Sequence, residues 1–442
     1  MFFNKNVPIK LFSLIIFITT IDAQIYGDVY ETSRSDIQFT VPANDPKWLT
    51  INWINFRSPA VHIILANDPL VRTFRKTDSW IFGTRWIYDV GNGDQQALFV
   101  IKPMNSSGTT RTVSYDPNTM NSANVTTGCY GYYAYKVDQT GQVLSSFCTK
   151  LYPSWMYDLR FHLGRFRIRE LFIPGSHDSA AYNDGSINPN VFLNRYALAQ
   201  DDTIRQQLLR GVRYLDLRIG YEKLLNPQFW TAHGVVRWRP LINDLEQVRN
   251  FAKETQEIII LDMHQFEYGL NNSSIHDQLV EIFYNTLSDV LVSPSIGWNG
   301  TLQDIWSSGR NVILSYNNIE VVNKYPKLLW PPIEQKWANV RDVNLLLSYL
   351  TEVHRQLAEN KTSFQPVADM AELTPTIVGI ITGTDLDLRT TADQVNPRLH
   401  DRYFGEFCST ANIVAVDFLQ GTSVVDAAIH CNLKRTPRKF TN

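Results

Sequence analysis

From Glu170 onward, short apolar runs alternate with helical patterns, and this alternation constrains the fold more than any other feature of the chain. Helices fit the segments 202–211, with Asp202 as cap and Gly211 as stop, 241–254 and 273–291. The expected strands lie between and beyond them, at 171–174, 213–219, 229–233, 257–264, 311–316, 376–382 and 412–418. Such alternation over about 270 residues predicts a parallel sheet with crossover helices, in an α/β fold of the TIM-type (β/α)8-like barrel class.

Residues 24–152 have a different pattern, in which short alternating runs are separated by turn residues. The runs lie at 48–54, 60–66, 97–102 and 130–137, and the turn-like segment DQTGQ follows the last of them. Short alternating strands between turns are typical of an all-β sandwich. We therefore predict an N-terminal β-sandwich domain over 24–152 and a barrel domain over 153–442.

Residues 1–23 have the pattern of a secretory signal peptide, because Lys5 and Lys10 precede a short apolar run that ends at Ile18 and is followed by the small Ala23. The run is shorter than the roughly 20 residues that a membrane-spanning helix needs. We therefore expect a secreted, extracellular protein. Sequons for N-glycosylation agree with this, and they stand at Asn105, Asn124, the overlapping Asn271 and Asn272, Asn299 and Asn360.

The chain has four cysteines, at Cys129, Cys148, Cys408 and Cys431. An even number in a secreted protein predicts disulfides, and of the three possible pairings we predict the two local ones, Cys129–Cys148 and Cys408–Cys431. Neither pair has the spacing of zinc ligands, so we expect no metal site there. The first bridge would join the strands on either side of the DQTGQ turn.

The charge balance argues against some classes of function. Lysine and arginine number 41 and aspartate and glutamate 43, for a formal net charge of −2, so bulk electrostatics do not favour nucleic-acid binding. A hydrophobic fraction of 44% excludes a disordered chain. Without a G-x-S-x-G, P-loop or G-x-G-x-x-G motif, serine hydrolases, nucleoside triphosphatases and Rossmann dehydrogenases lose their main support.

Charged residues stand near the ends of several expected barrel strands. Asp216 and Arg218 share one face of their strand, Asp262 and His264 share a face of another, and Asp417 is the charged residue of the last strand. A charge inside a barrel is costly unless it is paired or functional. Because barrel enzymes build their sites at the carboxyl ends of strands, these residues are candidates for a site.

Two histidines complete this set. His177 and Asp178 are adjacent in the segment PGSHDSAAY, and His233 lies in TAHG. Two histidines, an arginine and carboxylates are the groups that phosphodiester cleavage by acid–base catalysis needs. One histidine removes a proton from the attacking hydroxyl, the other protonates the leaving oxygen, and the arginine neutralises the phosphoryl oxygens.

The segments PGSHDSAAY, QQLLRGVRYLDLR, TAHG, IIILDMH and VAVDF follow one another in this order within about residues 155–435. In this order they resemble the X-domain of phosphatidylinositol-specific phospholipases C, particularly the secreted animal group with an N-terminal β-domain. The resemblance implies a phosphodiesterase acting on phosphatidylinositol or glycosylphosphatidylinositol lipids at a membrane surface. It also implies catalytic roles for His177 as general base, His233 as general acid, Asp417 as the partner that orients His177, and Asp178 as support for His233 and Arg218.

Arg218 stands where the calcium-dependent enzymes of the resembled family carry an acidic metal ligand and the bacterial enzymes carry arginine. A guanidinium supplies charge and two donors to a phosphate, so we expect a calcium-independent reaction without a cofactor. We expect Asp216, Asp262 and His264 to contact the substrate, although the resembled enzymes carry lysine or glutamate where His264 stands. The alternative is a non-catalytic module on the same fold that binds a lipid headgroup or membrane. The protein partners are not predicted.

Overall fold

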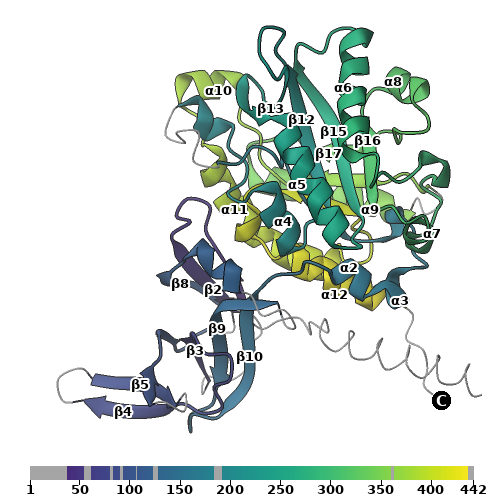
Figure 1. Ribbon diagram of the computed structural model, residues 1–442. Helices are drawn as coiled ribbons and strands as arrows, with labels where there is room; N and C mark the ends of the chain where they lie inside the picture. Colours follow the sequence, from purple (N-terminus) through teal and green to yellow (C-terminus); the bar gives the residue numbers. More distant parts are fainter. Residues whose placement is uncertain are drawn as a thin grey trace, which may run out of the picture.

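The computed structural model describes residues 37–53, 61–79, 83–89, 93–105, 107–122, 128–183, 192–359 and 363–436. Figure 1 shows two parts, an N-terminal part built of strands and a larger part of helices and strands. We call them the β-region (residues 37–152) and the α/β part (residues 153–436). The expected signal peptide lies outside the described residues. No helix within the described ranges is long and apolar enough to span a bilayer.

Seven parallel strands form the centre of the α/β part: β11 (Ile173–Ser176), β12 (Tyr214–Tyr221), β15 (Ile259–Tyr268), β16 (Val312–Tyr316), β17 (Glu334–Trp337), β18 (Val367–Met370) and β19 (Ile413–Val416). Their order in the sheet is β16, β15, β12, β11, β19, β18, β17. Trp330, which precedes β17, forms a parallel bridge with Ser315 of β16 and so links the two edges. The described residues thus give a seven-stranded parallel barrel, one strand fewer than expected.

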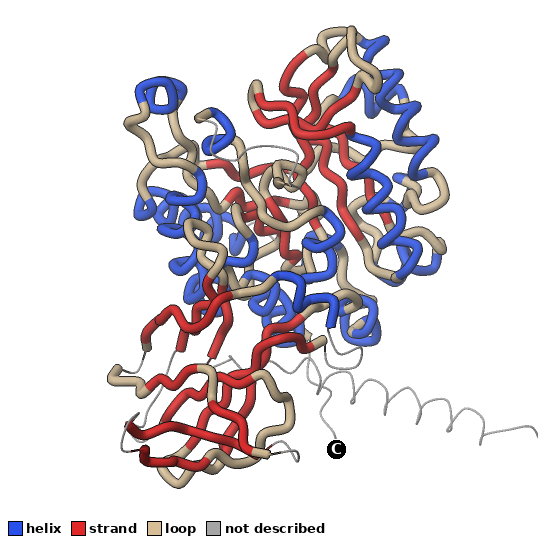
Figure 2. Tube along the Cα trace, turned by 60° about the vertical axis from the view of Figure 1, so that its left-hand side comes forward, coloured by secondary structure: helices blue, strands red, loops and turns tan. Residues whose placement is uncertain are grey.

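Helices surround these strands, as the blue tubes beside the red ones show in Figure 2. Helix α5 (Leu241–Glu254) shows how an amphipathic pattern packs a helix against the strands, since Leu241, Leu245 and Val248 are fully buried at helical spacing. The helices of this part are α2 (Trp155–Asp158), α3 (Arg160–Leu163), α4 (Ile204–Arg210), α5 (Leu241–Glu254), α6 (Ser273–Leu287), α7 (Leu302–Ser307), α8 (Ile319–Lys324), α9 (Val343–Glu359), α10 (Ile377–Thr382), α11 (Leu388–Asp401) and α12 (Val424–Arg435).

Several predictions about elements were wrong. Residues 376–382, predicted as a strand, contain helix α10, because Thr376 caps it by accepting from Gly379 N and Gly383 ends it in a left-handed conformation. A short apolar run does not distinguish a strand from a helix. Strand β13 (Phe229–His233) has the predicted bounds, but it pairs antiparallel with β12 and with β14 (Val236–Pro240), outside the parallel barrel. Strands β17 and β18 were not predicted, since each has only four residues and β17 is polar.

The start of α4 also differs from the prediction. Thr203, not Asp202, is its N-cap, and the Thr203 side chain accepts a hydrogen bond from Gln206 N in a capping box. Asp202 instead pairs with Arg210 at 2.6 Å. A hydroxyl at the capping position satisfies a backbone donor that the first turn leaves open, and the neighbouring carboxylate is then available for another partner.

Gly211 ends α4 as predicted, with φ of +115°. A Cβ there would lie 2.6 Å from Val425 Cγ1. We expect Gly211→Ala to lower the free energy of unfolding by about 2–4 kcal/mol, since it adds steric overlap to the cost of a left-handed alanine. Urea denaturation measures this loss. Gly309→Ala is the matched control, because Gly309 has φ of +68° after α7 but open space around its Cβ position. Equal losses in the two variants would contradict the steric contribution.

The β-region contains antiparallel sheets. The first is β1 (Ile37–Thr40), β2 (Trp48–Trp53) and β8 (Gly108–Ser114); the second is β10 (Val143–Lys150), β9 (Cys129–Val137), β3 (His62–Ala66) and β7 (Phe99–Ile101); the third is β4 (Arg75–Ser79), β5 (Gly83–Asp89) and β6 (Asp94–Gln96). The expected alternating runs fall on β2, β3, β7 and β9. The first two sheets share one cluster of buried apolar side chains, to which Ile51 of β2 and Ile63 of β3 belong.

Both predicted disulfides are confirmed. Cys129–Cys148 joins β9 to β10 across the DQTGQ turn, and Cys408–Cys431 joins the segment after α11 to α12. Of the sequon asparagines, Asn105, Asn271, Asn272 and Asn299 are exposed, while Asn124 and Asn360 lie outside the described residues. Glycosylation stays a prediction.

Candidate active site

The central pair of the site is built by two neighbouring barrel strands. His177 directly follows β11 and Asp417 directly follows β19, and these strands pair in parallel with Ser176 opposite Val416. The shared register therefore places the two side chains together. His177 Nδ1 lies 2.7 Å from Asp417 Oδ1, and both side chains are buried. An aspartate in this position fixes the tautomer and orientation of the imidazole.

His233 is the last residue of β13. This strand pairs with the carboxyl-terminal half of β12, past the residues of β12 that pair with β11. The centroid of its ring lies 6.1 Å from that of His177, with the two planes nearly perpendicular. His233 Nδ1 lies 3.0 Å from Asp178 Oδ2 and 2.9 Å from the carbonyl oxygen of Ala197. Because Nδ1 is engaged in this way, Nε2 is the nitrogen that can exchange a proton with a ligand.

Arg218 lies between the histidine pair and a set of carboxylates. Its Nη2 donates to His177 Nε2, its Nε lies 3.5 Å from Asp216 Oδ2, and its Nη1 lies 3.8 Å from Glu267 Oε1. Asp216 Oδ2 also accepts from the backbone N–H of Asp178 at 3.0 Å. Strand alternation places Asp216 and Arg218 on the same face, as the sequence predicted, and the barrel brings His177, Asp178, His233 and Asp417 to them.

The chain is similar to several known proteins. No family model matches the chain. PI-PLC X domain-containing protein 1 of Danio rerio is 32% identical over 224 residues, which cover 46% of this chain and 70% of that protein. This chain belongs to the PI-PLC X domain-containing proteins. PI-PLC X domain-containing protein 2 of Homo sapiens is also similar, at 28% identity over 263 residues, 54% of this chain and 82% of that protein.

The fold of the α/β part is that of bacterial enzymes. A phosphatidylinositol-specific phospholipase C from Staphylococcus aureus superposes with a TM-score of 0.51 at 15% identity, over 63% of this chain and 97% of that one. The family predicted from the sequence motifs is confirmed, and the barrel-type fold with it.

The two histidines of this PI-PLC X domain differ in their electrostatics. Burial disfavours protonation of His177, but the adjacent Asp417 outweighs it and raises the pKa of His177 to about 9. Burial, together with the positive charges of Arg218 and His177, lowers the pKa of His233 to about 3. A guanidinium only donates, so the hydrogen bond from Arg218 forms when His177 Nε2 is unprotonated, and protonation of His177 breaks it. Asp417 thus raises the pKa of His177, and Arg218 lowers it.

These shifts predict how the histidines titrate in the ligand-free PI-PLC X domain. We expect His177 to retain a proton above pH 7 and His233 to stay neutral at pH 5, which NMR of histidine-labelled protein can measure. Since the pKa of His177 is raised by folding, its pairing with Asp417 stabilises fully below pH 6.5 and progressively less as pH rises toward 9. An anion such as inositol 1-phosphate beside Arg218 should raise the pKa of His233. A value near 6.5 for His233 without ligand would contradict this electrostatic account.

Asp262 lies deeper in the barrel than the sequence suggested. Its Oδ2 accepts from the Tyr214 hydroxyl at 2.6 Å, and its Oδ1 accepts from Ser315 Oγ at 2.9 Å. His264 Nδ1 lies 3.3 Å from Asp262 Oδ2, and after the opposing effect of burial this carboxylate raises the pKa of His264. Both carboxylate oxygens of Asp262 therefore have protein partners. His264 is more exposed than Asp262 and is the better placed of the two to contact a ligand.

Three residues near the site were not predicted from the sequence: Glu372, Glu267 and Gln335. Glu372 follows β18, is 5% exposed, and has its pKa raised to about 7, chiefly by burial. Gln335 of β17 donates to Asp216 Oδ1 at 3.2 Å. Glu372 and Gln335 were missed because β17 and β18 were not predicted as strands, and Glu267 because β15 continues beyond its predicted end at residue 264.

Proposed function

We propose that this protein is a PI-PLC-like phosphodiesterase that cleaves phosphatidylinositol or glycosylphosphatidylinositol lipids by acid–base catalysis. One observation carries the proposal: His177, held by Asp417, faces His233 across 6.1 Å, with Arg218 in contact with His177. An acid and a base that face each other beside a cation are the groups that in-line displacement at an anionic phosphorus requires.

The proposed reaction starts from the protonation state in which His177 Nε2 is unprotonated and His233 carries a proton, which the phosphate anion of the bound substrate favours. His177 Nε2 then takes the proton of the inositol 2-hydroxyl, and that oxygen forms a bond to phosphorus. The bond from phosphorus to the diacylglycerol oxygen breaks, and this oxygen takes a proton from His233 Nε2. The products are diacylglycerol and an inositol cyclic phosphate. Arg218 must leave His177 Nε2 for the phosphoryl oxygens, and it then neutralises their charge.

We propose that the reaction does not depend on calcium. The support is Arg218, whose guanidinium lies beside the base and is held by the carboxylates of Asp216 and Glu267. A guanidinium presents parallel donors that match two phosphoryl oxygens and brings the positive charge that a metal ion would otherwise supply.

Unpartnered acceptors support a headgroup rich in hydroxyls. Glu372 Oε2 and Glu267 Oε1 are buried and have no hydrogen-bond partner among the described residues, and Glu267 Oε1 has only the ion pair with Arg218 Nη1 at 3.8 Å. A buried acceptor without a donor is costly, so a ligand that donates hydrogen bonds would relieve both. The hydroxyls of an inositol ring are donors of this kind.

An apolar rim, which we define as Phe192, Leu193, Ile377, Val378 and Ile381, supports action at a lipid surface. The three residues of α10 are each at least 70% exposed. In both views α10 lies at the end of the α/β part that is remote from the β-region (Figures 1 and 2). The rim connects to the site, because the Tyr196 hydroxyl donates to the Asp385 carbonyl beside α10, and the next residue, Ala197, contacts His233.

The rim makes a separate prediction. We expect Ile377→Ser with Ile381→Ser to lower hydrolysis of phosphatidylinositol in vesicles by at least about tenfold. Two isoleucine side chains that enter the bilayer would contribute more than about 1.4 kcal/mol to membrane binding. Hydrolysis of a monomeric short-chain lipid should stay within about twofold of wild type. Leu70→Ser is the matched control, since Leu70 is 81% exposed on the β-region. Equal vesicle activity in the rim variant and wild type would exclude this membrane contact.

The decisive experiment measures diacylglycerol and inositol cyclic phosphate released by purified protein, with and without a chelator. Product release that the chelator does not affect supports the proposal. Binding to liposomes without turnover, equal in wild type and His177→Ala, would instead support the alternative of a non-catalytic lipid-headgroup module.

We also propose that the protein is secreted and that the strands of the β-region form a sandwich. Disulfides persist in oxidising compartments, so Cys129–Cys148 and Cys408–Cys431 support secretion. The cluster of buried side chains shared by the first two sheets supports the sandwich.

A further inference from the structure

Asp417 is followed by a turn with a strained backbone. Phe418, the next residue, has φ of +46°, a left-handed conformation that a bulky side chain rarely adopts. The chain then passes through the short 3-10 segment η6 (Leu419–Gly421). Such a conformation persists only where its surroundings hold it. A shift of this turn would move the carboxylate that contacts His177.

Two side chains of the α/β part hold the near end of the turn. Asn396 Nδ2 donates to the carbonyl oxygen of Asp417 at 3.0 Å. Gln200 Nε2 donates to the carbonyl oxygen of His177 at 2.9 Å, and Gln200 Oε1 accepts from Leu419 N at 3.2 Å. These bonds tie the ends of the two catalytic strands to each other within the barrel.

The far end of the turn is held at Gln420. The backbone N–H of Val41, in the β-region, donates to the carbonyl oxygen of Gln420 at 2.9 Å. Gln420 Nε2 donates to Asp202 Oδ1 at 2.9 Å, and Asp202 Oδ2 accepts from Arg210 Nε at 2.6 Å. The Asp202 and Arg210 side chains are only 5% and 12% exposed. Water therefore competes little for the charge-assisted bond between Asp202 and Arg210.

Arg210 extends the chain into the β-region. Its Nη1 donates to the Tyr130 hydroxyl at 2.8 Å, and its Nη2 donates to the Tyr115 hydroxyl at 2.9 Å. The β-region is thus linked to Gln420 in two ways. One is the backbone hydrogen bond from Val41, and the other is the series of side-chain bonds through Asp202 and Arg210 to the two tyrosines.

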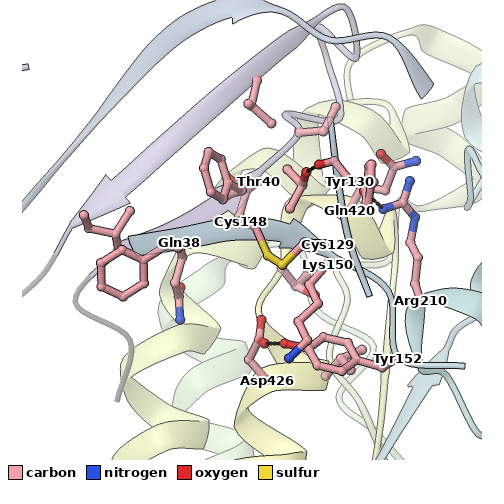
Figure 3. Close-up of a pocket in the computed structure, with 18 of the residues that line it drawn as sticks. Gln38, Thr40, Cys129, Tyr130, Cys148, Lys150, Tyr152, Arg210, Gln420 and Asp426 are labelled. Atoms are coloured by element: carbon pink, nitrogen blue, oxygen red, sulfur yellow. Dashed lines mark hydrogen bonds between the residues drawn. A yellow bond between two sulfur atoms is a disulfide. The ribbon is translucent and has the colours of Figure 1, made fainter. Parts of the chain in front are cut away.

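A cavity of about 400 Å³ separates the two parts beside these contacts. Figure 3 shows Tyr130, Arg210 and Gln420 on one side of it and Lys150, Tyr152 and Asp426 on another. Gln420 Oε1 has no hydrogen-bond partner among the residues the structure describes. Since a cavity cannot confine a side chain as a packed core does, the hydrogen bonds of Gln420, rather than close packing, set its position.

We propose that Gln420, Asp202 and Arg210 are positioning residues through which the β-region holds Asp417 against His177. The inference rests on the proposed function for the catalytic meaning of that contact. It deepens that function, because it makes the geometry of the general base depend on a part of the chain outside the barrel.

The test removes the side-chain hydrogen bonds that link the β-region to Gln420. The variant Tyr115→Phe with Tyr130→Phe deletes only two hydroxyl oxygens, and Gln420→Leu deletes the bond to Asp202. For both we expect the pKa of His177 to fall by about 0.5 or more, because Asp417 is then held less closely. We expect kcat on a monomeric short-chain phosphatidylinositol to fall by about tenfold, with KM within about twofold. NMR of histidine-labelled protein and steady-state kinetics measure these changes.

Arg205→Gln is the matched control, since Arg205 lies on the same helix but forms an exposed pair with Glu254. It should leave the pKa of His177 and kcat as in wild type. If Gln420→Leu does not fold, the tyrosine variant decides alone. Unchanged His177 pKa and unchanged kcat in the folded tyrosine variant would overturn the inference. The pKa is measured without substrate, so a wild type without turnover would refute the proposed function and leave this test intact.

Discussion

Replacing His177 with alanine is expected to lower kcat by about 10²–10⁴-fold, the range that general acid–base catalysis contributes. The imidazole takes the proton of the attacking hydroxyl in the proposed reaction, and Asp417, 2.7 Å away, holds it in place. The Asp417 carboxylate cannot replace it, because it lies behind the ring, at Nδ1. Release of inositol cyclic phosphate at saturating short-chain substrate measures the loss.

Because His177 is only 5% exposed, its replacement also leaves a small void, and the control must share this property. His276 is equally buried, and its Nδ1 lies 2.6 Å from the Tyr316 hydroxyl, outside the site. His276→Ala should lose comparable thermal stability while kcat stays within about threefold of wild type. A His177→Ala variant that keeps more than a tenth of wild-type turnover would refute the assignment of the base.

Replacing Arg218 with lysine is expected to lower kcat by about 10²–10³-fold, the cost of one lost transition-state donor. Lysine keeps the positive charge, but it lacks the planar fork that can bind two phosphoryl oxygens at once. The retained charge keeps the electrostatic surroundings of both histidines similar. The loss therefore reports mainly on donor geometry.

Arg205→Lys is the control for this change, because it alters an exposed ion pair with Glu254 in the same way. It should leave kcat unchanged. Chelator should not affect the wild type, since Arg218 supplies the charge. Wild-type activity that a chelator abolishes and calcium restores would contradict the role of Arg218, as would an Arg218→Lys variant within threefold of wild type.

Much of the candidate site could be predicted from local pattern. Strand alternation placed Asp216 and Arg218 on one face, and the expected barrel placed Asp417 at a strand end, because a two-residue period is a property of any strand. Glu372 and Glu267 could not be found in this way. Their strands are short or run past the predicted end, and a lone acidic residue in a loop carries no periodic signal.

The apolar segment 376–382 shows the same limit. Its composition favoured a strand, whereas the Thr376 cap and the left-handed Gly383 make it a helix whose isoleucines are exposed. A short apolar run is compatible with a buried strand or with an exposed helix. Only the surrounding chain decides between them.

By itself, the sequence determined the α/β character of residues after 170, the two disulfides, the family, and the residues that carry charge at strand ends. These follow from spacing and from side-chain chemistry, which are local properties. Only the tertiary structure decided that β11 and β19 are neighbours, which brings Asp417 within 2.7 Å of His177 across 240 positions of sequence. It also decided that the β-region contacts the turn after Asp417. Strand order and contacts between parts depend on how distant segments pack, and no local pattern encodes that packing.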